Sequence, residues 1–366
     1  MDSRQPRRIL FYRIGQIGDT VIALPAIWAI RRYFPKAFMA LLYDQHAGRN
    51  YPQALRTLPE RGLFDEFFSY QANQDGAPLG KIIKYIPQIR RRQFDTLVYL
   101  APRFRSKRQI WRDLVFFRLS GITRFIGHRG MIAFNKLKGE APLPYLDHEA
   151  DHLLSRLGRS GIPVPPPGQG CMDLLLTEEE MQGAREWLTN HPGLNEQRIL
   201  IGMGVGSKFP EKVWPRERFA QLGRYLIDRI AGVPVIFGGP EDRELGNSLI
   251  NEWRAGANAA GELTVRQAAA VLSFCRLYVG NDTGPMHLAA AVGTRCVGIF
   301  SARDFPGSWY PYGPHHIVLR SKVACEGCKL IGCHNDMACL KLISVGDVVK
   351  ACDKALNDEF SNKHDN

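Results

Sequence analysis

The segment Val279–Gly293, Val-Gly-Asn-Asp-Thr-Gly-Pro-Met-His-Leu-Ala-Ala-Ala-Val-Gly, combines residues that could bind an anionic ligand. An apolar strand is followed by Asp282 and Thr283, either of which can cap a helix that begins at Pro285. Main-chain amides at a helix start, at the carboxyl end of a parallel strand, readily bind a diphosphate. The alternative is a well-capped helix with a buried histidine. The residues predicted to bind the ligand are Asp282, Thr283, Gly284 and His287.

An acidic residue, Asp19, stands in the glycine turn Arg13-Ile-Gly-Gln-Ile-Gly-Asp-Thr, directly after the first apolar run. A glycine turn after a first strand often holds a phosphate, but a carboxylate there would repel one. Asp19 is therefore predicted to accept a proton from a bound hydroxyl, as a general base does. The alternative that the residues leave open is an aspartate that caps the next helix.

Two further loops carry charge between a predicted strand and a predicted helix. In Gly206–Pro215, Lys208 and Lys212 supply positive charge that suits a phosphate. Glu241 follows Gly-Gly-Pro after another apolar run, and a carboxylate in that place could bind a ribose diol. Each loop taken alone is also consistent with a solvated surface.

The positive charge of this 366-residue chain is concentrated in one stretch. The net charge is +12, and residues 81–129 hold 13 Lys and Arg but only the acids Asp95 and Asp113. An acidic partner is predicted to bind there. Within it, Phe104–Phe117 mixes cations with large apolar side chains, as an interfacial membrane helix does. The apolar residues could equally form the core face of an amphipathic helix. The cations predicted to contact an acidic acceptor are Arg103, Arg105, Lys107 and Arg108.

The elements that must position these residues follow a strand–turn–helix order, which predicts an α/β fold with parallel sheets. Ile162–Gly170, rich in Pro and Gly, reads as a linker between two such units. We expect domains at residues 1–170 and 171–350, followed by a helix end and tail at 351–366. The predicted strands are Arg8–Arg13, Ala37–Tyr43, Asp95–Leu100, Ile199–Gly204, Val233–Phe237, Leu277–Gly280 and Cys296–Phe300, and the predicted helices include Pro25–Phe34, Pro215–Ile230 and one from Pro285.

Several other functions are disfavoured by the sequence. His148–His152 matches His-Glu-x-x-His, but the third zinc ligand of a metalloprotease is missing at the expected spacing. No nucleic-acid-binding motif accompanies the basic stretch, so no nucleic-acid partner is predicted. No signal peptide and no apolar run long enough to span a bilayer is visible. Four clustered cysteines, which could hold zinc or remain free thiols, are Cys325, Cys328, Cys333 and Cys339.

As an ordered set, four motifs make the chain resemble the heptosyltransferase family, glycosyltransferase family 9. They are Arg-Ile-Gly-x-Ile-Gly-Asp-x5-Pro-Ala, Lys-x-Trp-Pro, Phe-Gly-Gly-Pro-Glu and Gly-Asn-Asp-Thr-Gly-Pro-Met-His, and the similarity extends from Ile9 to about Val349. One departure is Ser301-Ala302-Arg303-Asp304, where many members have a Gly-Pro-Thr-Asp-like turn.

The resemblance implies a GT-B fold, with two Rossmann-like α/β/α domains facing a central cleft. It implies inverting transfer of a sugar, typically heptose from ADP-heptose, to an acidic glycolipid acceptor of the lipopolysaccharide core, with no required metal. Asp19 inherits the role of general base and Lys212 a phosphate contact, while Glu241 inherits a ribose contact. The implied location is the cytoplasmic face of an anionic inner membrane, to which the protein binds peripherally. Two alternatives remain, a family member with another nucleotide sugar and acceptor, and a non-catalytic nucleotide-sugar binder.

Overall fold

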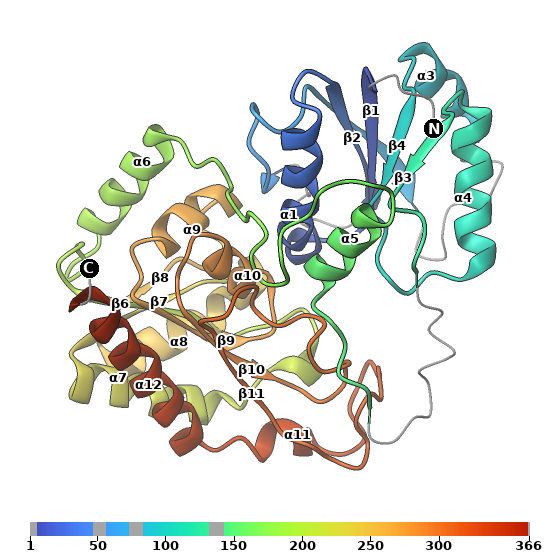
Figure 1. Cartoon of the computed structure of the whole chain (residues 1–366). Helices are drawn as coiled ribbons and strands as arrows, with labels where there is room; N and C mark the ends of the chain where they lie inside the picture. The colour runs from blue at the N-terminus through green and yellow to red at the C-terminus, as the bar shows by residue number, and fades with distance from the viewer. Residues whose placement is uncertain (1–5, 47–55, 73–82, 132–142, 365–366) are drawn as a thin grey trace. The chain divides into compact units, whose positions relative to one another are not determined.

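The computed structural model describes residues 6–46, 56–72, 83–131 and 143–364. The chain divides into two compact units, an N-terminal one of residues 1–142 and 147–175 and a C-terminal one of residues 143–146 and 176–366. Each is an α/β unit built on one parallel sheet (Figure 1). The predicted α/β fold class of the GT-B type is therefore confirmed at the level of its two Rossmann-like units.

The N-terminal unit has a five-stranded sheet in the order β3-β2-β1-β4-β5, with every neighbouring pair parallel. Helices α3 and α4 cover one face of this sheet, and α1 and α5 lie on the other (Figure 1). The elements are β1 (Arg8–Arg13), α1 (Ile17–Tyr33), β2 (Phe38–His46), β3 (Glu66–Ala72), α3 (Ile86–Arg91), β4 (Thr96–Tyr99), α4 (Lys107–Leu119), β5 (Arg124–Ile126) and α5 (Glu149–Gly158).

The C-terminal unit has a six-stranded parallel sheet in the order β11-β10-β9-β6-β7-β8. Its elements are α6 (Glu178–Thr189), β6 (Ile199–Gly204), the 3₁₀ helix η3 (Pro210–Lys212), α7 (Arg216–Ile230), β7 (Gly232–Ile236), the 3₁₀ helix η4 (Pro240–Asp242), α8 (Arg243–Trp253), β8 (Ala257–Asn258), α9 (Val265–Leu272), β9 (Leu277–Asn281), α10 (Gly284–Ala291), β10 (Cys296–Phe300), β11 (Ile317–Arg320), α11 (Ala338–Lys341) and α12 (Val345–His364). Both sheets order their parallel strands as Rossmann-like units do.

The central strands of both sheets lie where the sequence predicts them, and their ends differ from the predicted ends by at most three residues. The helix predicted from Pro25 begins earlier, at Ile17, and Pro25 lies inside α1. Its start is stabilised by Asp19, whose carboxylate accepts from the amide of the N-cap residue Gln16 at 2.8 Å. A proline inside a helix removes one backbone hydrogen bond. Here the surrounding turn is completely buried, and packing keeps the helix continuous.

The unit boundary lies between Leu175 and Leu176, whereas the sequence places it between residues 170 and 171. Residues 143–146 also belong to the C-terminal unit, and α12 extends through residues 351–364, where the sequence predicts a helix end followed by a tail. Among the described residues, no helix is long and apolar enough to cross a membrane.

Candidate functional site

The C-terminal unit gathers three loop ends at the carboxyl edge of its sheet through one buried side chain, Asn281. Its amide oxygen accepts from the Trp214 amide at 3.0 Å, and its Nδ2 donates to the carbonyls of Val205 at 3.0 Å and Gly206 at 3.2 Å. Asn281 is fully buried at the end of β9. These hydrogen bonds therefore fix the ends of β6 and β9 and the segment after η3 relative to one another. The residues next to them are held in place by the same contacts.

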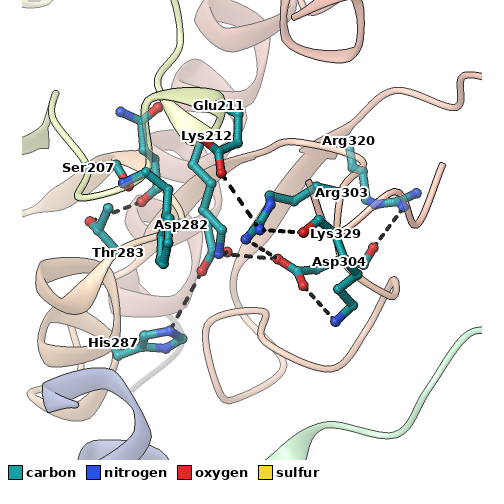
Figure 2. A network of polar contacts seen from close by, with 12 residues as sticks. Ser207, Glu211, Lys212, Asp282, Thr283, His287, Arg303, Asp304, Arg320 and Lys329 are labelled. Atoms are coloured by element: carbon teal, nitrogen blue, oxygen red, sulfur yellow. Dashed lines mark hydrogen bonds and ion pairs between the residues drawn. The ribbon is translucent and has the colours of Figure 1, made fainter. Parts of the chain in front are cut away.

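Lys212, the last residue of η3, meets Asp282 directly after β9. Lys212 Nζ lies 2.6 Å from Asp282 Oδ2 and 3.4 Å from Asp304 Oδ2 (Figure 2). Burial alone would lower the pKa of Lys212, but the carboxylates of Asp282 and Asp304 outweigh it and raise that pKa. The ammonium is thus held charged near neutral pH.

His287 lies one turn into α10 and is 4% exposed. Its Nε2 is 3.9 Å from Asp282 Oδ1 (Figure 2). Burial, together with the charge of Lys212, lowers the pKa of His287 to about 3. The imidazole is consequently neutral at physiological pH, so it can donate or accept a hydrogen bond but adds no positive charge.

The start of α10 offers its amides to a ligand. Thr283 is the N-cap residue, and its hydroxyl turns back to the Asn281 carbonyl at 3.3 Å. The Thr283 side chain does not cap this helix, which begins with Gly284 and Pro285. A helix N-terminus without a side-chain cap carries partial positive charge and free N–H groups that suit an anion.

Glu241 is placed differently from the other predicted donor-binding residues. It lies exposed in η4, after the end of β7. Its neighbour Asp242 is the residue that turns inward, where its carboxylate accepts from the Gly239 amide at 2.9 Å. The ribose contact proposed for Glu241 is therefore compatible with an accessible side chain at the same sheet edge.

Three charged residues that were not predicted as site residues complete this network: Arg303 and Asp304, from the loop that departs from the family pattern, and Lys329. Arg303 lies 3.7 Å from Glu211 and 3.4 Å from Asp304, and Lys329 lies 2.8 Å from Asp304 (Figure 2). Burial would raise the pKa of Asp304, but the surrounding cations lower it to about 2. A signal for this cluster was present, because Arg303 and Asp304 follow β10, the neighbour of β9 in the sheet.

The four clustered cysteines form no disulfide bond. They line a small cavity of about 20 Å³ together with Glu211 and Arg303. Within the described ranges, no three His, Cys, Asp or Glu side chains are arranged to hold a metal ion. His148, from the protease-like motif, instead caps α5 by accepting from the Ala150 amide.

In the N-terminal unit, Asp19 lies in the first turn of α1. One carboxylate oxygen accepts from the Gln16 amide at 2.8 Å, and the other lies 3.5 Å from the guanidinium of Arg13. Gly15 has a φ of +135°, and a Cβ there would come within 2.5 Å of the Asp19 side chain. Asp19 therefore caps the helix, and its side chain, which is 24% exposed, stays accessible enough for the predicted role as a base.

The four predicted acceptor-binding cations separate into two pairs. Arg103 is 2% exposed and forms an ion pair with Glu149, with Nε and Oε2 2.8 Å apart. Arg105 is bound to the buried Asp113. Lys107 and Arg108 at the start of α4 are exposed, and neither pairs with an acid among the residues that the structure describes. Arg103 and Arg105 therefore stabilise the fold, whereas Lys107 and Arg108 are accessible to a ligand. Lys81, the first residue of the predicted basic stretch, lies outside the described residues.

The geometry defines a class of protein. Two Rossmann-like units, one with an accessible carboxylate and one with a helix start beside a buried lysine, are the architecture of a GT-B nucleotide-sugar transferase. Residues 166–338 match the family model described as glycosyltransferase family 9 (heptosyltransferase).

The chain is also similar to known proteins over most of its length. It is 27% identical over 317 residues to lipopolysaccharide heptosyltransferase 2 of Escherichia coli, which covers 81% of this chain and 84% of that protein. It superposes on a family 9 glycosyltransferase of Veillonella parvula with a TM-score of 0.71 and 23% identity, over 96% of this chain and 97% of the other. For E. coli ADP-heptose lps heptosyltransferase II the TM-score is 0.68 and the identity 22%, over 96% and 99%. The family model and these similarities confirm the resemblance to the heptosyltransferases of glycosyltransferase family 9 that is seen in the motifs.

Proposed function

We propose that this protein is an inverting glycosyltransferase that moves heptose from ADP-heptose to an acidic glycolipid acceptor in lipopolysaccharide core biosynthesis. The observation that carries the proposal is the buried Lys212–Asp282 pair beside the start of α10. Support for the donor comes from relatives named as lipopolysaccharide heptosyltransferases and from a similar fold solved as E. coli heptosyltransferase WaaC with ADP, with a TM-score of 0.65 and 16% identity over 95% of this chain and 99% of that one.

In the proposed reaction the C-terminal unit binds the donor. Lys212 and the first amides of α10, near Thr283 and Gly284, stabilise the departing diphosphate, which is the electrostatic part of catalysis. Neutral His287 donates a hydrogen bond to a phosphate or hydroxyl oxygen of the donor, and the Asp282 carboxylate accepts one from a hydroxyl. Glu241 contacts the ribose. This set needs no group beyond the donor itself, and we propose that none is required.

The N-terminal unit supplies the base and the acceptor contacts. Asp19 removes the proton of the acceptor hydroxyl, which attacks the anomeric carbon from the face opposite the diphosphate. Lys107 and Arg108 bind acidic groups of the acceptor and hold the protein at an anionic cytoplasmic membrane surface, where each cation near the leaflet contributes about 1 kcal/mol. Arg103 and Arg105 are already paired with Glu149 and Asp113, so we assign the acceptor contacts to Lys107 and Arg108 alone.

The deciding experiment is a transfer screen with purified protein. ADP-, GDP-, UDP- and dTDP-linked sugars are each offered with a deacylated and an acylated inner-core acceptor, and the product is identified by mass spectrometry. Turnover with ADP-heptose and not with the others is expected. A lack of transfer and of donor hydrolysis with every sugar would contradict the enzymatic proposal, whereas turnover with another nucleotide would correct only the donor.

A further inference from the structure

A large cavity opens in the N-terminal unit between α4 and the sheet. Its volume is about 600 Å³, inside the range of roughly 300–1,000 Å³ typical of small-molecule sites. The floor includes Tyr12 and Leu42 from the strands, and Tyr70 and Tyr85 form part of the wall. All of its lining residues belong to one unit, so the cavity is a property of that unit alone.

Helix α4 has one face that packs in the core and a second, mixed face that lines the cavity, and Phe116 and Phe117 contribute to both. Phe117 is 1% exposed and packs against Tyr12, with ring centroids 5.1 Å apart. The second face follows a spacing of three and four residues and lines the cavity. At its two ends Trp111 is 69% exposed and Leu119 is 58% exposed. The cavity-lining residues of this face are Arg108, Trp111, Arg112, Val115, Phe116 and Leu119.

The polar groups at the floor are already satisfied. The hydroxyls of Tyr12 and Tyr70 lie 3.2 Å apart, within hydrogen-bond distance of each other. The Asp113 carboxylate accepts from the Tyr99 hydroxyl at 2.7 Å and is also bound by Arg105 and Arg112. A further polar group buried against this floor would find few hydrogen-bond partners. The wall therefore favours an apolar occupant.

Positive charge lies at one end of the cavity. Lys107 and Arg108 line it at the amino-terminal end of α4, and Arg112 follows one turn later. Leu119 lies at the other end of the helix, about 18 Å away at the rise of an α-helix. One leaflet of a bilayer has a hydrocarbon depth of about 15 Å. An apolar slot of this length with cations at one end is complementary to an anionic head with a single acyl chain.

We propose that this cavity holds one acyl chain of an anionic membrane phospholipid, with the phosphate at Lys107 and Arg108 and the chain along Trp111, Val115 and Leu119. The inference goes beyond surface attachment, because it assigns a defined, stoichiometric lipid site. It does not depend on which sugar the enzyme transfers.

The test measures lipid retention by the full chain without sugar substrates. Protein is incubated with phosphatidylglycerol or phosphatidylcholine, bulk lipid is removed, and bound lipid is counted by native mass spectrometry. One phosphatidylglycerol per chain is expected, with little phosphatidylcholine. Val115→Trp fills the cavity from a half-buried position and should lower retention at least tenfold, while Lys107→Gln with Arg108→Gln should abolish the preference for the anionic lipid.

Leu342→Trp is the matched control, because it adds the same indole at an exposed apolar position of the other unit. It should retain lipid as the parent does, and thermal unfolding checks that each variant is folded. In vesicles of phosphatidylglycerol with brominated acyl chains, Trp111 fluorescence should be quenched, as shown by the difference from Trp111→Phe.

Three results would overturn the proposal. They are no retained lipid, equal retention of the two lipids by the parent, and parent-like retention by a folded Val115→Trp variant. Retention of an acceptor glycolipid in place of phosphatidylglycerol would also overturn it, since the occupant would then be the substrate. Failure of sugar transfer has no bearing on these readouts, so the two proposals fail separately.

Discussion

Replacement of Asp19 by Asn separates the catalytic role of this residue from its structural one. The carboxylate accepts the Gln16 amide and lies beside Arg13, so even a non-catalytic protein of this fold would benefit from an aspartate here. Its presence alone therefore does not distinguish an enzyme from a nucleotide-sugar binder. Asn keeps the shape and one acceptor oxygen but removes the proton-accepting charge.

The structure limits how much stability the Asn variant can lose. An amide oxygen can still accept from Gln16, and only the favourable charge in the first turn is lost, which costs on the order of 1 kcal/mol or less. Arg13 loses a neighbouring carboxylate but still donates to the carbonyls of Leu100 and Asp19, both at 2.6 Å. We expect a total loss of about 1–2 kcal/mol, which leaves the protein folded at 25 °C. Loss of a general base lowers turnover about 10²–10⁴-fold.

The assay compares Asp19→Asn and Asp19→Ala with the parent protein. Ala also removes the capping acceptor, which costs about 1 kcal/mol more. If Asp19 is the base, both variants lose turnover to the same extent although Ala melts lower, and ADP affinity measured by calorimetry stays unchanged in both. Parent-like turnover in a folded Asn variant would refute the assignment. Turnover that follows the melting temperature would show that Asp19 is only a cap.

The remaining predictions concern charge. Lys212→Gln should weaken ADP binding about 10–100-fold by calorimetry, because a charge-assisted contact is worth about 1.5–3 kcal/mol. Lys341→Gln, at an exposed position, is the control. An unchanged ADP affinity in Lys212→Gln would show that Lys212 does not contact the donor. Arg103→Met should lower the free energy of unfolding, measured in urea, by about 3–5 kcal/mol, because Glu149 then stays buried and unpaired. Lys107→Met should lower it little. Equal losses in the two variants would contradict the conclusion that Arg103 is structural and Lys107 is not. Burial, together with the charges of Arg103 and Arg156, lowers the pKa of His152 to about 3. Between about pH 6.5 and 3 the unfolded chain therefore binds a proton at His152 that the folded chain does not, and stability falls as the pH is lowered through that range. His152→Leu should flatten that fall by ~1 kcal/mol per pH unit, and an unchanged slope would exclude the histidine as its cause.

The strands that could be predicted from sequence are the central ones. All four strands that were missed, β3, β5, β8 and β11, lie at sheet edges. Central parallel strands are buried on both faces and read as continuous apolar runs. Edge strands have one neighbour and are often short, as with Arg124–Ile126 and Ala257–Asn258, so their pattern carries little signal.

The donor loops could be predicted because each lies within a few residues of a strand end. Parallel strands bring their carboxyl ends to one sheet edge, so Lys212 and Asp282 were expected near each other although 70 positions separate them. The partners of those residues were not predictable in this way. That Asp304 and Lys329 join the network depends on which loops fold back over the edge after β10 and β11.

The sequence by itself determined the α/β class, the positions of the central strands along the chain, the family resemblance and the loops in which the candidate site residues lie. These features depend on local periodicity and on short motifs, which can be recognised without knowledge of long-range contacts. Only the tertiary structure decided which charges are free. Arg103 and Lys107 lie four positions apart in one basic stretch, yet the first is buried against Glu149, 46 positions away, and the second remains in solvent. The difference arises because burial of a charge requires a partner at hydrogen-bond distance, and long-range packing alone places that partner.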